Sequence, residues 1–333
     1  CQIYYRVTGS SQWLDGYPLF RVDFNGQNMM AGSLLFLQPS TKYEIRLELS
    51  DPDGGDQQRQ LSISTKSLPA EPNSGRTLYV VPGTGGGAGI PGDPFQGIDA
   101  AQAEALPGDT FLLSPGVYSG ESHFTVSGEP GKYIVWKGSG SGNVIVETIR
   151  VDADHLWFEN LVVEGNQYGL RTYDNPKDIV VTGNRLTGCH YCIYLNHGGT
   201  GWFIGDNHIQ GDVDPASGDF SGEGIELNHS NDHTVLFNDI SRVADGISYP
   251  GRNCDIFGNE IYDVSDDGIE PDYGYANNRI FKNRISNALH NGISFQPMNG
   301  APWYILRNQV AAPLESAIKF RNAVDRALLA HNT

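Results

Sequence analysis

The sequence has no long apolar run, very little methionine and few basic residues. No stretch approaches the roughly 18 consecutive apolar residues of a membrane-spanning helix, so we predict no membrane partner. Methionine occurs 3 times against 41 glycines, which favours turns and strands over helices. Lys and Arg number 22 against 39 Asp and Glu, a net charge of -17. This charge argues against nucleic acid as a partner, and against a polyanion unless a cation or a local basic patch intervenes.

Cysteine is also scarce, with Cys1, Cys189, Cys192 and Cys254 in the whole chain. Cys189-His190-Tyr191-Cys192 has the C-x-x-C spacing of redox and zinc sites. A structural zinc site requires a second such pair, and the sequence contains none. We therefore favour a buried structural cysteine pair over a zinc site.

Residues 1–67 are predicted to form a small antiparallel β domain, because apolar residues alternate with polar ones over 43–49. The segment LQPSTKY (37–43) resembles the L-x-P-x-T-x-Y signature of fibronectin type III domains, in which the tyrosine, here Tyr43, makes a tyrosine corner. The resemblance covers the last two thirds of such a module, so we expect its first two strands to be missing. The Pro/Gly-containing stretch LPAEPNSGR (68–76) predicts a linker to a second domain at 77–333.

The second domain is a repeat. The motif φ-x-x-N-x-φ, in which φ is apolar, recurs at intervals of 24, 23, 31, 21, 24, 25 and 24 residues, with asparagine at positions 160, 184, 207, 238, 259, 283, 308 and 332. A second motif, x-G-I-x-φ, interleaves with it, as in EGIEL (223–227) and DGISY (245–249). One strand pair and one asparagine turn per coil predict an all-β parallel solenoid with the asparagines stacked as a ladder.

This pattern resembles the right-handed parallel β-helix proteins of the pectate-lyase-like type, from residue 77 to 333. FQGIDAAQAEALPG (95–108) is predicted to be an amphipathic helix that caps the first coil and covers its strand edge. The chain stops just after Asn332 without a second cap, and we expect it to be truncated there.

Stacked coils place matching residues in columns about 4.8 Å apart, and alternate residues of a strand point outward. The column after the Ile of each x-G-I motif contains Arg171, Tyr194, Glu226, Ser248, Glu270, Ser294 and Lys319. Two residues further on it contains Tyr173, Asn196, Asn228, Pro250, Asp272, Gln296 and Arg321. We predict a groove with acids in its middle coils, and we expect Arg171, Tyr173, Tyr194, Asn228, Gln296 and Arg321 to bind substrate.

The longest interval, 31 residues, indicates the same place independently. Its extra residues fall in GDVDPASGDFSG (211–222), directly before Glu223. A long loop on one side of one coil is typical of a groove wall. The insertion and the acids therefore predict one site.

Two carboxylates about 5 Å apart repel each other by about 3 kcal/mol at an effective dielectric of 20. A shared proton, a cation or a nearby base must relieve this repulsion. A shared proton raises one pKa, which is what acid/base cleavage of a glycosidic bond requires. Acids on neighbouring coils, such as Asp245 and Asp267, are expected about as far apart as the two carboxyls of retaining glycosidases. Acids on next-but-one coils, such as Glu226 and Glu270, are expected near the separation found in inverting glycosidases.

Asp245-Gly246-Ile247, followed by Asp266-Asp267-Gly268-Ile269, resembles the polygalacturonase-type glycoside hydrolases, which have N-T-D-G, then D-D, G-H-G and R-I-K. The resemblance implies acid/base roles for Asp245, Asp266 and Asp267 and places Lys319 at the end of R-I-K. The sequence departs from the pattern at Val243-Ala244, at His290-Asn291-Gly292 and at Ala317. We predict hydrolysis without a cofactor, with Asp245, Asp266, Asp267, Glu270, His290 and Lys319 as catalytic candidates.

The region also resembles polysaccharide lyases of this fold, which implies acids that hold Ca²⁺ against a uronate and a Lys or Arg as base. Glu226, Glu270 and Asp272 are then the predicted Ca²⁺ ligands, with Asn228 as a further oxygen donor. Lys319, Arg321 or Arg171 is the predicted base.

Structural alternatives accompany each site residue. Aspartates at β-helix turns often cap backbone N–H groups. His290 and His229 are alternatively turn residues, and the tyrosines alternatively stack on the surface without a function. A protein that binds glycans or builds surface fibres without catalysis is the third functional hypothesis. The favoured hypothesis is a secreted enzyme that cleaves a polysaccharide.

Overall fold

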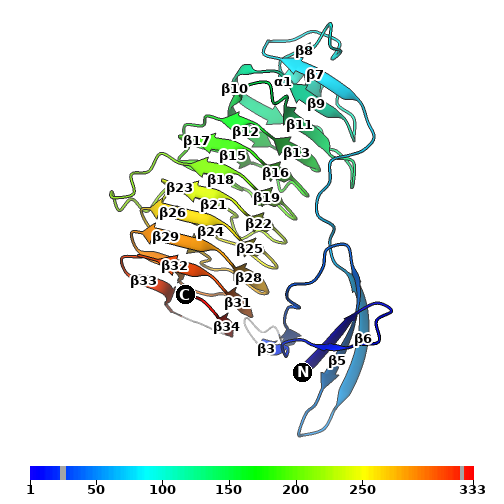
Figure 1. Ribbon diagram of the computed structural model, residues 1–333, viewed down its shortest axis with the longest axis vertical. Helices are drawn as coiled ribbons and strands as arrows, with labels where there is room; N and C mark the ends of the chain where they lie inside the picture. Colours follow the sequence, from blue (N-terminus) through cyan, green and yellow to red (C-terminus); the bar gives the residue numbers. More distant parts are fainter. Residues whose placement is uncertain (23–27, 323–325) are drawn as a thin grey trace.

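The protein is described by a computed structural model that covers residues 1–22, 28–322 and 326–333. It is an all-β protein that consists of a parallel β-solenoid and a small antiparallel sheet at its N-terminus (Figure 1). The predicted fold class is confirmed. No helix in the described ranges is long and apolar enough to cross a membrane.

The solenoid has three faces of parallel strands, and two of these faces diverge from the long strands β10 (Gly116–Phe124) and β12 (Val144–Val151). The face that follows the x-G-I motif, called the groove face here, contains β15 (Tyr168–Thr172), β18 (Tyr191–Tyr194), β21 (Glu223–Glu226), β24 (Asp245–Ser248), β27 (Ile269–Glu270), β30 (Asn291–Phe295) and β33 (Ser316–Phe320).

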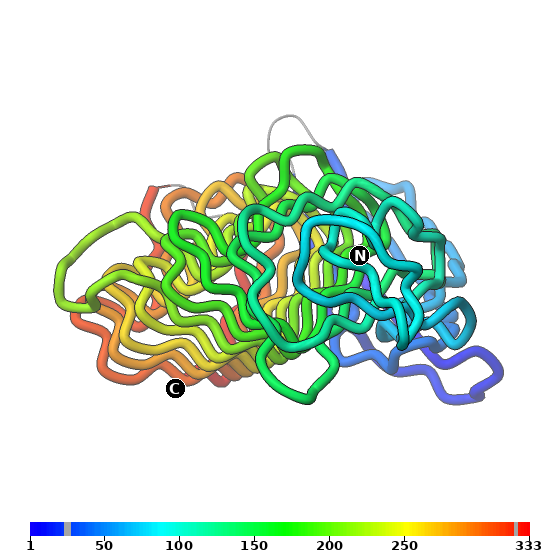
Figure 2. Tube along the Cα trace, turned by 90° about the horizontal axis from the view of Figure 1, so that it is seen from above, coloured from blue at the N-terminus to red at the C-terminus, as the bar shows by residue number. Residues whose placement is uncertain are grey.

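The other two faces complete each coil. One contains β14 (Val162–Val163), β17 (Arg185–Thr187), β20 (His208–Gln210), β23 (Asp239–Ser241), β26 (Glu260–Val264), β29 (Arg284–Ala288) and β32 (Gln309–Ala311). The other contains β7 (Thr77–Val81), β8 (Phe95–Gln96), β9 (Thr110–Leu113), β11 (Ile134–Gly138), β13 (Leu156–Glu159), β16 (Val180–Thr182), β19 (Phe203–Gly205), β22 (Thr234–Leu236), β25 (Asp255–Phe257), β28 (Asn278–Phe281), β31 (Trp303–Leu306) and β34 (Ala327–Ala330). The coils stack along one axis (Figure 2).

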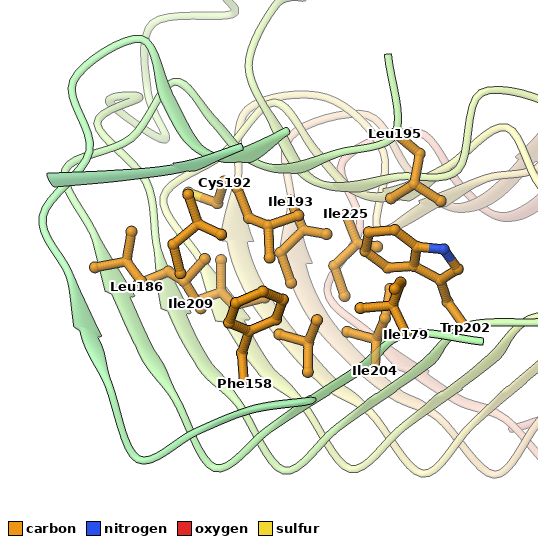
Figure 3. Close-up of a cluster of buried hydrophobic side chains, with 14 of the residues drawn as sticks. Phe158, Ile179, Leu186, Cys192, Ile193, Leu195, Trp202, Ile204, Ile209 and Ile225 are labelled. Atoms are coloured by element: carbon orange, nitrogen blue, oxygen red, sulfur yellow. The ribbon is translucent and has the colours of Figure 1, made fainter. Parts of the chain in front are cut away.

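One continuous apolar core fills the interior of the coils. The Ile of each x-G-I motif points into it, and Ile193, Ile225, Ile247 and Ile269 are fully buried. Figure 3 shows how the inward side chains of successive coils stack between the three faces. Because every second strand residue must face this core, the residues between them are presented outward in register.

An asparagine ladder runs along one corner of the solenoid. From Asn207 onward, each ladder asparagine accepts at Oδ1 from the backbone N and the Nδ2 of the asparagine one coil before it, as Asn259 does from Asn238 at 3.0 and 2.9 Å. The ladder extends from Asn184 to Asn332 and is buried over most of that length. Asn160 does not pair with Asn184 as predicted, because Asn184 accepts from the backbone N of Leu161 instead, while Nδ2 of Asn160 donates to the backbone carbonyl of Gly138 in the preceding coil at 3.1 Å.

The predicted capping helix is present but short. Helix α1 covers Ile98–Gln102 and buries Ile98 and Ala101. The prediction of a helix from residue 95 was wrong, because Phe95–Gln96 pairs as β8 and Gly97 then adopts a φ of 97°. The helix still covers a strand edge, since the Gln102 amide bonds the backbone of β10 at His123 (2.6 Å).

The N-terminal residues form an antiparallel sheet in the order β2 (Leu14–Asp15), β1 (Gln2–Val7), β5 (Lys42–Leu49) and β6 (Gln57–Ser64), beside the hairpin of β3 (Phe20–Val22) and β4 (Met29–Ala31). The Tyr43 hydroxyl accepts from the backbone N of Gln38 at 2.9 Å, the kind of bond a tyrosine corner makes. The resemblance to fibronectin type III domains stays a prediction.

The sheet lies beside the C-terminal coils (Figure 1). The Tyr304 hydroxyl accepts from the backbone N of Ser33 at 2.9 Å, and Arg279 donates to the Ser33 hydroxyl at 3.1 Å. Phe36 packs edge-on against Phe281, with ring centroids 5.6 Å apart. These contacts hold the N-terminal region against the face that contains β28 and β31. That face is not the groove face, which carries the predicted site residues.

Cys189 and Cys192 form a disulfide, and both are fully buried. The structural cysteine pair is therefore confirmed, and the zinc interpretation is wrong because both sulfur atoms are bonded to each other. The disulfide joins Cys189, before β18, to Cys192, which lies in β18 between Tyr191 and Tyr194.

Candidate active site

The outward columns of the groove face have the predicted register. Arg171 pairs with Tyr194, Tyr194 with Glu226, Glu226 with Ser248, and Ser248 with Glu270. Ser294 then pairs with Lys319. Residues spread over about 150 positions of sequence therefore line one straight row, and the acids occupy its middle.

Glu226 and Glu270 are the partly exposed acids of this row, with the fully buried Ser248 between them. Two coil steps of about 4.8 Å place their backbones about 10 Å apart. Burial raises the pKa of Glu226 to about 7. Burial, together with repulsion from Asp272 and Asp267, raises the pKa of Glu270 to about 8. Both carboxyls can therefore hold a proton near neutral pH.

A hydrogen bond from a tyrosine holds the Glu270 side chain in position. The Tyr249 hydroxyl hydrogen-bonds the Glu270 carboxyl, and burial next to these acids raises the pKa of that tyrosine. Tyr249 therefore stays a neutral donor. Between the two glutamates, the Ser248 hydroxyl donates to Oε2 of the buried Glu223 at 2.7 Å.

Asp245 and Asp267 form a second polar ladder at the entry to the strands, and each is only 2% exposed. Oδ1 of Asp245 accepts from the backbone N of Asp267 at 3.0 Å. Oδ1 of Asp267 accepts from the backbone N and Nδ2 of Asn291 at 2.8 and 2.7 Å. These bonds favour the turn-capping interpretation for both aspartates. Burial, followed by repulsion from Glu223, raises the pKa of Asp245 well above its usual range.

Asp266 differs from its neighbour Asp267 because its side chain is partly exposed. Its Oδ1 lies 2.7 Å from Nδ1 of His290. Burial and repulsion from Asp267 raise the pKa of Asp266, although His290 and Lys319 oppose the shift. The structure thus places the Asp266 carboxyl in contact with the His290 ring, and the catalytic roles of these residues stay predictions.

Carboxylate oxygens of Asp245, Asp266 and Asp267 lie within 4.8 Å of one another. This set differs from the predicted Ca²⁺ ligands Glu226, Glu270 and Asp272, which stay a prediction. Asp272 is 4% exposed, and its Oδ1 has no hydrogen-bond partner in the described part of the chain. Burial raises the pKa of Asp272 to about 7. The acids of this region thus present oxygen atoms that a proton or a cation would stabilise.

The N-terminal end of the groove face is aromatic. The rings of Tyr168 and Tyr194 stack with centroids 5.7 Å apart and an interplanar angle of 2°, and Tyr191 lies 4.9 Å from Tyr194. Arg171 lies over the Tyr168 ring at 4.8 Å and is paired with Glu121. We call Tyr168, Tyr191 and Tyr194 the tyrosine stack.

The remaining predicted binding residues lie in the outer column. Tyr173 is exposed and packs between Arg150, 4.1 Å from its ring centroid, and His197. Asn228 bonds the backbone of the preceding coil through Nδ2. At the C-terminal end, Arg321 donates to Oε1 of Gln296 at 3.4 Å. These residues lie on the same face as the acids, and Lys319 is two coil steps beyond Glu270.

The inserted segment 211–222 stands out from the stack between β20 and β21 (Figures 1 and 2). The Ser265 hydroxyl donates to the backbone carbonyl of Asp219 at 2.6 Å, and Phe220 stacks on His290 with centroids 5.1 Å apart. The length of this insertion predicted a groove wall, but no sequence pattern indicated Phe220 as a site residue, because the number of coils that a loop crosses leaves no periodic signal.

Residues 169–332 match the family model described as the right-handed beta helix region. No curated protein matches the sequence. Several solved structures match in fold. XylC in complex with xylose has a TM-score of 0.58 at 11% identity, over 77% of this chain and 70% of that one. Pectate lyase Pel9A has a TM-score of 0.56 at 13% identity, over 78% and 80%. A rhamnogalacturonan lyase has 0.54 at 15% identity, over 78% and 88%.

These findings define the fold of the molecule as a right-handed β-helix. The identities are low, so the likeness concerns the fold.

Proposed function

We propose that the protein hydrolyses glycosidic bonds of a polysaccharide that lies in the groove, with Glu270 as general acid and Glu226 as general base. The pairing of these two glutamates in one outward row, two coils apart, carries the proposal. Their backbone spacing of about 10 Å is close to the roughly 6.5–9.5 Å between the carboxyls of inverting glycosidases, and side-chain rotation can close the difference.

In the proposed reaction, protonated Glu270 gives its proton to the leaving glycosidic oxygen as the bond from that oxygen to the anomeric carbon breaks. Ionised Glu226 takes a proton from a water molecule, whose oxygen forms the new bond to the anomeric carbon from the opposite side. Both carboxyls then exchange protons with solvent. The Tyr249 hydroxyl orients Glu270, and the small, buried Ser248 lies between the two acids.

Asp266, His290 and Lys319 flank this pair in the proposal. Asp266 and His290 form a polar, partly exposed pair, and the Asp266 charge acts on Glu270. Lys319 contributes positive charge at the C-terminal end, where it lowers the pKa values of Asp266 and Asp272 against the effect of burial. Asp245 and Asp267 hold the entry turns in register through their backbone bonds.

A Ca²⁺-assisted polysaccharide lyase is the second candidate, and the unpartnered Oδ1 of Asp272 beside several other acids favours it. Carboxylate oxygens are the ligands that Ca²⁺ prefers. Asp245, Asp266 and Asp267, with Asp272 or Glu270 nearby, would hold the ion, and its charge would stabilise the carboxylate of a bound uronate. Lys319 is then the candidate base. We also propose that the protein is secreted. A glycan-binding protein without catalytic activity is the third candidate.

The two chemistries give different products. Purified protein is incubated with pectate, rhamnogalacturonan and xylan, with and without EDTA. Hydrolysis releases reducing ends without ultraviolet absorbance from an unsaturated sugar, and EDTA has no effect. Reducing ends together with that absorbance, lost in EDTA, would replace hydrolysis by elimination. Release of neither on these polymers would contradict both reactions.

A further inference from the structure

The 211–222 loop runs along the edge of the groove face and passes several coils. It leaves the solenoid after β20 and returns at β21, yet its contacts reach far beyond these strands. Asp219 meets Ser265 before β27, and Phe220 meets His290 before β30. The loop therefore starts beside the tyrosine stack and extends past Glu270 in the direction of the C-terminus.

Both ends of the loop are tied to one histidine. Nδ1 of His190 lies 3.0 Å from Oδ1 of Asp212, and Nε2 lies 3.2 Å from the Ser221 hydroxyl. Between these points, Asp214, Ser217 and Asp219 bond backbone and side-chain groups of the loop itself. A loop with this many internal bonds is ordered before any ligand binds, which lowers the entropy cost of binding.

Phe220 lies near the C-terminal end of this ordered loop, directly before Ser221. It is 64% exposed although it is an aromatic side chain. One ring face stacks on the His290 imidazole, with an interplanar angle of 23°. His290 in turn contacts Asp266 through Nδ1. The ring is thus held in one orientation beside the acids and leaves its second face open.

We propose that Phe220 forms a sugar-stacking subsite on the C-terminal side of the Glu226/Glu270 pair, opposite to the tyrosine stack. This inference rests on the proposed function, since it assigns subsites to that groove. Aromatic faces with few polar neighbours are typical linings of carbohydrate and small-molecule sites. The tyrosine stack begins one coil before Glu226, and His290 lies one coil after Asp266.

Two aromatic platforms on opposite sides of the acid pair determine how a glycan lies. The polymer runs along the solenoid axis, with sugar units bound on both sides of the cleaved bond. The substrate is therefore the interior of a chain. Stacking on an uncharged ring also selects for the flat apolar face of a sugar, whatever its carboxyl content.

Phe220→Ala tests the subsite, and Phe237→Ala is the matched control. Phe237 is also exposed, at 54%, but it lies between β22 and β23 at a different corner and packs on Phe257. Binding is measured by affinity electrophoresis in gels that contain pectate, rhamnogalacturonan or xylan, in a Glu270→Gln background so that the polymer is not consumed. We expect Phe220→Ala to weaken retention about tenfold, equivalent to about 1.4 kcal/mol, Phe237→Ala to leave it unchanged, and Phe220→Tyr to restore it.

In the active background, Phe220→Ala should raise KM with little change in kcat, because the ring binds the sugar without touching the reacting bond. Equal retention by the Phe220→Ala and parent proteins, equal losses in both alanine variants, or no retention by the parent in any of the three gels would overturn the subsite. Full activity of Glu270→Gln would instead refute the acid/base assignment and leave the retention result valid.

Discussion

Asp267 accepts two hydrogen bonds from Asn291, one from its backbone N and one from Nδ2, while its own backbone N donates to Asp245. A carboxylate with its oxygen engaged in this way holds neighbouring coils together. Asp267→Ala would leave two buried donors of Asn291 without this acceptor. We expect a loss of about 1–3 kcal/mol in the free energy of unfolding, measured by urea denaturation.

Asp267→Asn separates structure from chemistry at the same position, because its amide oxygen can still accept from Asn291. We expect this variant to recover most of the stability that Asp267→Ala loses and to retain measurable activity. Complete loss of activity in a stable Asp267→Asn protein would show that Asp267 takes part in the reaction.

The asparagine ladder gives a second prediction about stability. Asn259→Ala removes a buried amide that bonds both neighbours, Asn238 and Asn283. We expect a loss of about 1–3 kcal/mol or more in the free energy of unfolding. Asn160→Gly is the control, since Asn160 is exposed, has a φ of 53° and donates one hydrogen bond to the Gly138 carbonyl without pairing with another asparagine of the ladder. Its loss should be less than half as large, and an equal loss would contradict the register found here.

The sequence predicted these columns well because parallel stacking preserves register. Once the Ile of each x-G-I motif is placed inside, the row that holds Glu226 and Glu270 follows from strand alternation. Asn160 was misplaced because one residue of offset between coils changes the partner, and the sequence motif alone does not reveal such an offset. The burial of Asp245 and Asp267 was likewise beyond the pattern, since it depends on how closely the next coil covers the entry turn.

The position of Phe220 could not be predicted for a different reason. A loop insertion shows where a chain leaves the solenoid, but its course depends on contacts such as that between Asp219 and Ser265. These contacts join residues 46 positions apart. No periodicity connects them.

The pH dependence of kcat/KM follows from the two raised glutamate pKa values. The base Glu226 is ionised above a pKa of about 7, and the acid Glu270 is protonated below a pKa of about 8. We therefore expect a bell-shaped profile with its maximum between these values. The profile is measured by reducing-end release over pH 5 to about 10. A plateau that continues down to pH 5 would contradict the role of Glu226.

The same groups make stability depend on pH. Glu226, Glu270 and Asp272 have higher pKa values in the folded protein than in the unfolded chain, so the folded state binds more protons between about pH 4 and 8. The free energy of unfolding should therefore decrease as pH rises through this window. Thermal unfolding checks the slope, and Glu270→Gln should reduce it.

Added Ca²⁺ distinguishes whether a bound proton or a bound cation relieves the repulsion among Glu226, Glu270 and Asp272. If a cation holds them, millimolar Ca²⁺ at pH 8 should raise Tm, and Asp272→Asn should weaken that rise. A Tm at pH 8 that is the same in EDTA and in Ca²⁺ supports the shared proton and hence hydrolysis.

The central claim is that Glu270 supplies the proton for glycosidic cleavage, and Glu270→Gln tests it most directly. The amide keeps the size of the side chain and cannot act as the acid. Glu164→Gln is the control, because Glu164 is exposed on the turn after β14. Reducing-end release from the polymer that the parent cleaves should fall by about 100-fold or more in Glu270→Gln and stay unchanged in Glu164→Gln. Undiminished release by a folded Glu270→Gln protein would contradict the account.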